Sequence, residues 1–155
     1  MSLGHCHRLP AMLAVIRAYL IAVAVTYLLG AVLATQVVLA RVRGMGMSVT
    51  LGDRFHATTH DLAGLAGSYL PLIAIALVPG LFAASRLARW WPRFGAVLYP
   101  LAGAVAVVAI HLAVKALLGL NGIAAVREWH GLALQALAGW VGGYFYFMAR
   151  GLARR

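Results

Sequence analysis

Four long apolar runs dominate the chain, and each has the length of a membrane span. They cover residues 13–40, 62–85, 94–118 and 132–149. The first is interrupted only by Arg17, and its residues 18–40 would rise about 34 Å as a helix, enough to cross a hydrocarbon core of about 30 Å. The alternating segments of about ten residues that are typical of membrane barrels do not occur in the sequence. The pattern therefore predicts four transmembrane helices.

The expected architecture is all-α: an integral membrane four-helix bundle that forms one transmembrane domain over residues 1–155. We expect helices near 13–40, 53–86 (with the membrane part at 62–85), 94–118 and 131–149. The second helix should begin at an Asp53 N-cap and extend about two turns beyond the membrane. Pro71, Pro79 and Pro100 each lack a backbone donor and should bend their helices.

Composition supports the membrane assignment. The chain is 64% hydrophobic and only 10% charged, whereas soluble domains carry about 25% charged residues. These values exclude a soluble enzyme, a disordered tail and a disulfide scaffold, and the single Cys6 excludes an internal disulfide. The net charge of +10 comes from arginines that flank the apolar runs, which favours contact with anionic lipid headgroups over nucleic acid.

The arginine distribution predicts the orientation. Eight arginines flank the helices on the side of the termini: Arg8, Arg17, Arg86, Arg89, Arg93, Arg150, Arg154 and Arg155. Four lie on the opposite side: Arg41, Arg43, Arg54 and Arg127. Positively charged loops stay in the cytoplasm, so both termini are expected to be cytoplasmic. The composition, rich in Ala and Arg, suggests a bacterial source and hence the inner membrane.

The side opposite the termini gathers most of the titratable groups. The acidic residues there are Asp53, Asp61 and Glu128. His56 and His60 are four residues apart, so on a helix their imidazoles could share a metal ion, with His130, Asp53 or Glu128 as a third ligand. A haem held between His60 and His130 is a further alternative. The simpler interpretation is that these histidines hydrogen-bond the wet end of the bundle or respond to pH.

His111 and Lys115 form a polar pair on one face of the third helix. His111 lies about 10 Å below the end of that helix, at a depth where an ionisable group indicates a functional site by default. Lys115 is close enough to the end to extend its amine to the interface. The alternative for His111 is a hydrogen bond to a polar residue of a neighbouring helix. The candidates for that partner are Thr26, Thr35, Gln36 and Gln135.

Small residues indicate close helix packing. Gly139 and Gly143 form such a pair in the last helix, and Gly64 and Ser68 form another in the second. The pairs would serve packing within the chain or a homodimer face.

The sequence contains no phosphate-binding glycine loop, no Gly-x-Ser-x-Gly elbow and no Cys-x-x-Cys, and it identifies no cofactor. We therefore expect a non-catalytic accessory or structural membrane protein that binds lipid, a second copy or a partner subunit. The alternatives are a metal- or haem-binding redox protein and a small proton-coupled transporter that uses His111 and Lys115.

Overall fold

The computed structural model describes residues 8–118 and 128–152. Cys6, Arg127, Arg154 and Arg155 lie outside the described residues. The elements in chain order are α1 (Arg8–Gly44), α2 (Leu51–Leu65), α3 (Tyr69–Trp90), the 3-10 turn η1 (Pro92–Phe94), α4 (Gly95–Leu118) and α5 (Trp129–Leu152). No strand occurs in the described ranges. The all-α prediction is confirmed.

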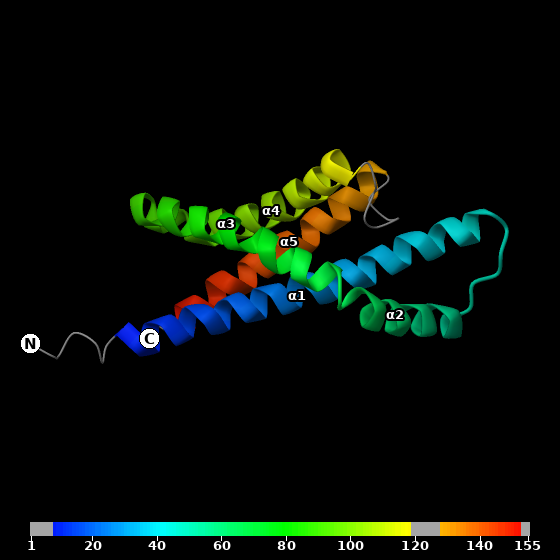
Figure 1. Cartoon of the computed structure of the whole chain (residues 1–155), viewed down its shortest axis with the longest axis horizontal. Helices are drawn as coiled ribbons and strands as arrows, with labels where there is room; N and C mark the ends of the chain where they lie inside the picture. Colours follow the sequence, from blue (N-terminus) through cyan, green and yellow to red (C-terminus); the bar gives the residue numbers. More distant parts are fainter. Residues whose placement is uncertain (1–7, 119–127, 153–155) are drawn as a thin grey trace, which may run out of the picture.

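Four of the helices, α1, α3, α4 and α5, are long and apolar enough to cross a membrane. The 37 residues of α1 correspond to about 55 Å, so this helix runs the length of the molecule and extends beyond α4 and α5 (Figure 1). α2 lies antiparallel to the extended part of α1. The predicted four spans are present, with α2 as an additional short helix.

The start of α1 and the end of α5 lie at the same end of the bundle (Figure 1). We call this the arginine end; its described arginines are Arg17, Arg86, Arg89, Arg93 and Arg150. The opposite, acidic end carries Asp53, Asp61 and Glu128. All three acidic residues of the chain are thus remote from the arginine end.

Glycines on α5 allow it to pack between α4 and α1. A Cβ at Gly139 would collide with the Gly103 carbonyl of α4, and a Cβ at Gly142 would collide with the Thr26 hydroxyl of α1. Gly143 lies equally close to the Tyr99 carbonyl. These glycines therefore serve contacts within the chain, because only residues without a side chain permit this approach. Gly64 of α2, in contrast, has no neighbour within 4 Å of such a Cβ.

The expected continuous helix over 53–86 is wrong: the chain breaks into α2 and α3 at residues 66–68. Pro71 explains the position of the break, because its ring would clash with the carbonyl of Gly67 in an unbroken helix and it has no N–H to donate there. In the first turn of α3 the missing donor costs nothing. The apolar run continues through the break, so hydropathy alone does not reveal it.

The start of α2 also differs from the prediction. The N-cap is Thr50, and Asp53 is the third helical residue. The Thr50 hydroxyl accepts from the Asp53 N–H at 3.1 Å, while Asp53 Oδ2 accepts from the Thr50 N–H at 2.8 Å. Asp53 is thus the second partner of a capping box rather than the cap itself.

Candidate functional site

A hydrogen-bonded polar bridge crosses the interior of the bundle. The Tyr69 hydroxyl at the start of α3 donates to Gln135 Oε1 of α5 at 2.5 Å. Gln135 Nε2 in turn donates to the Gly30 carbonyl of α1 at 2.9 Å. Tyr69 and Gln135 are fully buried, and Gly30 has no side chain in their way. The bridge ties together three helices that are far apart in sequence.

His111 of α4 packs beside this bridge. Its ring meets the Tyr69 ring edge-on, with centroids 5.9 Å apart. Nδ1 lies 2.7 Å from the Val107 carbonyl of its own helix, and because a carbonyl only accepts, Nδ1 carries the proton. Nε2 is buried and has no hydrogen-bond partner among the described residues. The expected hydrogen bond from His111 to another helix is therefore not formed.

The candidate partners of His111 bond elsewhere. Gln135 belongs to the bridge, and Thr35 and Gln36 bond to α2. The Thr26 hydroxyl is buried without a partner in the described part of the chain. Lys115 is exposed in the last turn of α4, whereas His111 is buried, so the two residues lie in different environments despite their shared face.

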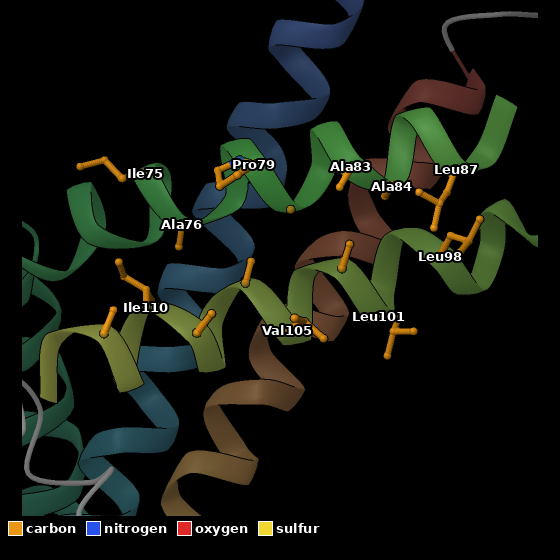
Figure 2. Close-up of a pocket in the computed structure, with 15 residues that line it drawn as sticks. Ile75, Ala76, Pro79, Ala83, Ala84, Leu87, Leu98, Leu101, Val105 and Ile110 are labelled. Carbon is orange, nitrogen blue, oxygen red and sulfur yellow. The ribbon is translucent and has the colours of Figure 1, made fainter. Parts of the chain in front are cut away.

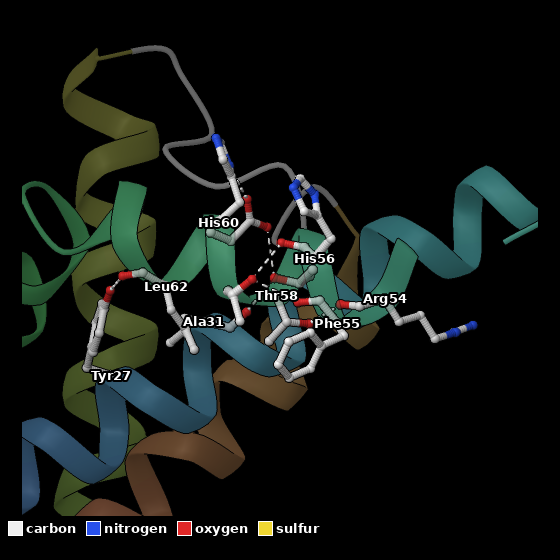
Figure 3. Close-up of polar contacts among 11 residues, drawn as sticks. Tyr27, Ala31, Arg54, Phe55, His56, Thr58, His60 and Leu62 are labelled. Atoms are coloured by element: carbon white, nitrogen blue, oxygen red, sulfur yellow. Dashed lines mark hydrogen bonds and ion pairs between the residues drawn. The ribbon is translucent and has the colours of Figure 1, made fainter. Parts of the chain in front are cut away.

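Polar contacts fix α2 against α1 (Figure 3). Thr35 donates to Asp61 Oδ2 at 2.8 Å, and Gln36 Nε2 donates to Thr58 Oγ1 at 3.2 Å. The Tyr27 hydroxyl donates to the Leu62 carbonyl. Asp61 of α2 accepts the hydrogen bond from Thr35 of α1. It therefore anchors the α1–α2 hairpin and is not a free acidic group.

His56 and His60 lie side by side on α2, with nearly parallel rings whose centroids are 6.5 Å apart (Figure 3). His130 of α5 is paired instead with Glu128, its Nε2 lying 2.9 Å from the carboxylate. Across residues 8–118 and 128–152, no three His, Cys, Asp or Glu side chains come together closely enough to hold a metal ion. The structure therefore does not assemble the expected trio of His56, His60 and His130.

Glu128 links α5 to the far end of α1, since Arg41 Nη2 lies 3.3 Å from its carboxylate. Asp53 serves the capping box, where hydrogen bonds from the Thr50 hydroxyl and then the Thr50 backbone lower the pKa of its carboxyl. Each acidic residue predicted for a ligand site is thus engaged in a contact that holds helices or helix ends in place.

The arginine end holds a polar cluster that the sequence analysis did not identify. Arg150 Nη1 of α5 donates to the Ser85 hydroxyl of α3 and to the Tyr99 hydroxyl of α4, both at 2.9 Å. The guanidinium also lies over the Tyr146 ring, 5.9 Å from its centroid. The sequence did contain a hint of this cluster. Ser85, Tyr99 and Arg150 each lie near the end of an apolar run, and the topology places these ends on the same side of the membrane.

A groove of about 560 Å³ lies between α3 and α4 (Figure 2). Its floor is built from small residues, among them Gly80, Ala102 and Ala106. The two helices approach so closely here that a Cβ on Gly80 would crowd both alanines. Its rims are exposed side chains such as Ile75, Leu101 and Val105. No side chain that lines the groove carries a hydrogen-bonding group.

Comparison with known proteins gives no relative: no family model, curated protein or solved structure matches this chain.

Proposed function

We propose that this chain is a small non-catalytic accessory protein of a bacterial inner membrane that binds lipid along its membrane-facing grooves. The observation that carries the proposal is the α3–α4 groove, which is long, apolar and open on the side of the bundle (Figure 2). Enzyme pockets combine apolar walls with a few convergent polar groups. This groove has apolar walls only, which suits a hydrocarbon chain.

The dimensions support a lipid chain as the occupant. The groove follows α3 from Ile75 to Leu87, and a helix rises about 18 Å over twelve residues. An extended acyl chain is of the same length as one leaflet, which is half of a hydrocarbon core of about 30 Å. The small residues of the floor leave room for a chain to lie between the rims.

The orientation belongs to the same proposal. The described arginines at the end shared by α1 and α5 support cytoplasmic termini, since arginine-rich flanks remain on the cytoplasmic side. The acidic end with the α1–α2 hairpin would then face the periplasm.

A cross-linking experiment tests the proposal. A photoreactive residue at Val105, on the rim of the groove, should capture a phospholipid after purification in mild detergent has removed bulk lipid. The matched control is Leu137 of α5, which has a similar exposed fraction, 51% against 58% for Val105, but lines none of the described grooves. Adducts of a membrane protein at Val105 would instead make the groove a subunit interface. Equal lipid capture at both sites, or none, contradicts the proposal.

One observation favours a second candidate function, proton-coupled transport. The His111 Nε2 atom is buried among membrane-spanning helices without a partner in the described residues, and it therefore keeps a lone pair for a proton. Vesicles that contain the protein and a pH-sensitive dye should then show a proton flux under a potassium-diffusion potential, and H111L should abolish that flux. Flux equal to that of protein-free vesicles rejects this candidate.

A further inference from the structure

A second groove, of about 310 Å³, lies between α1 and α3 and has an arginine at one end. Its walls include Val15, Ile16 and Tyr19 from α1 and Val78 and Phe82 from α3. Arg150 and Ser85 line it near the ends of α5 and α3, and Val78 lies about two helical turns before Ser85 on α3. A cationic group at the membrane edge thus continues into an apolar channel, which is the polarity of a phospholipid.

The Arg150 guanidinium is held in place and retains free donors. Among residues 8–118 and 128–152, its two hydrogen bonds, to Ser85 and Tyr99, both use Nη1. A guanidinium has five N–H donors in a planar fork, so the N–H groups on Nε and Nη2, which bond to none of the described residues, can serve a ligand. Planar paired donors match the oxygens of a phosphate better than those of an uncharged headgroup.

A second arginine packs on a wall residue of the same groove but does not line the groove itself. Arg86 is placed over the ring of Phe82, 5.3 Å from its centroid, and Phe82 is a wall of the groove. The whole chain has three acidic residues, Asp53, Asp61 and Glu128, all at the acidic end. No Asp or Glu side chain of this sequence therefore lies at the arginine end to neutralise Arg86 and Arg150.

We propose that an anionic phospholipid binds here, with its phosphate on Arg150 and one acyl chain in the groove between α1 and α3, while the positive charge of Arg86 on the wall residue Phe82 adds to the attraction for a net negative headgroup. This inference rests on the proposed lipid-binding function and specifies the lipid class. The groove between α1 and α3 differs from the α3–α4 groove, because the apolar lining of the latter would hold acyl chains without regard to headgroup charge.

Native mass spectrometry of the full chain in mild detergent tests the proposal, with equal amounts of phosphatidylglycerol and phosphatidylethanolamine added. The wild-type protein should retain phosphatidylglycerol preferentially. R150Q should weaken its binding about fivefold, the effect of one arginine on an anionic lipid at the membrane surface. The control R93Q removes the same charge from the same end but from a residue that lines none of the described grooves, and it should leave the preference unchanged.

A second variant keeps the test valid if R150Q does not fold. V78W fills the groove at an exposed wall residue without touching the Arg150 hydrogen bonds, and it should also reduce phosphatidylglycerol binding. If both lipids bind equally, or if R150Q and V78W behave like R93Q, the anionic site is refuted while lipid binding stands. If the wild-type protein retains neither lipid, the proposed function fails together with the inference.

Discussion

Tyr69 and Gln135, 66 positions apart in the chain, share a hydrogen bond of 2.5 Å in the interior of the bundle. The Gln135 amide extends the contact to the Gly30 carbonyl, so a single side chain joins α3 to α1 through α5. Inside a membrane such bonds help to select which helices associate, because unpaired polar groups are costly in hydrocarbon. The polar bridge therefore defines how the helices pack.

We predict that Y69F destabilises the folded protein by about 1–2 kcal/mol, because the Gln135 oxygen then remains buried without its donor. The matched control is Y144F, since Tyr144 is exposed and stacks on Trp140 through its ring, which phenylalanine preserves. Titration with SDS from mild detergent, followed by circular dichroism, measures both variants. Equal stability of Y69F and Y144F would show that the bridge contributes nothing.

Replacement of Gly103 by alanine should disrupt the α4–α5 contact. The new Cβ would overlap the Gly139 carbonyl, and overpacking of this kind costs about 1–3 kcal/mol. G64A provides the control, because a Cβ at Gly64 meets nothing within 4 Å. G64A should be neutral or slightly stabilising, since alanine is the better helix former. The same SDS titration applies, and a G103A protein as stable as G64A is incompatible with the described packing.

H111L should change stability by less than about 1 kcal/mol. The His111 ring bonds only to the Val107 carbonyl of its own helix, and its other nitrogen has no partner among the described residues, so an apolar side chain of similar volume forfeits little. A loss above about 2 kcal/mol in the unfolding titration would indicate that His111 makes an essential structural contact.

The start of α2 should loosen in acid. Hydrogen bonds from Thr50 lower the pKa of Asp53, so its folded pKa lies below its unfolded one. The stabilisation is therefore complete above the unfolded pKa and is lost as the pH falls through the folded pKa. Hydrogen exchange of α2, corrected for intrinsic rates, should show less protection at about pH 3 than at about pH 6. In D53N, the amides of α2 should be less protected at both pH values, and their protection should not depend on pH. If α2 of D53N loosens in acid as much as α2 of the wild type, another group causes the effect.

Much of the fold follows from the hydropathy pattern. A span needs about twenty apolar residues, and α1, α3, α4 and α5 each contain such a run. The break between α2 and α3 did not follow, because residues 62–85 are apolar on both sides of it and only Pro71 marks it. The N-cap was misplaced from Thr50 to Asp53 because both residue types cap helices, and the reciprocal pair becomes visible only in the structure.

The candidate sites were less predictable than the helices. Spacing within one helix places His56 beside His60, and the structure confirms that neighbourhood. Contacts between helices depend on rotation about each helix axis, which the sequence does not give. For this reason His130 pairs with Glu128 rather than with His56 and His60, and Gln135 bonds to Tyr69 rather than to His111. The Arg150 cluster unites three helices and escapes any single-helix pattern.

Lipid analysis of the protein, purified in mild detergent and washed free of bulk lipid, tests the central claim most directly. The account predicts about one or more phospholipids per folded chain, enriched in anionic headgroups relative to the membrane of origin. A folded protein that carries no phospholipid after the same washing contradicts it.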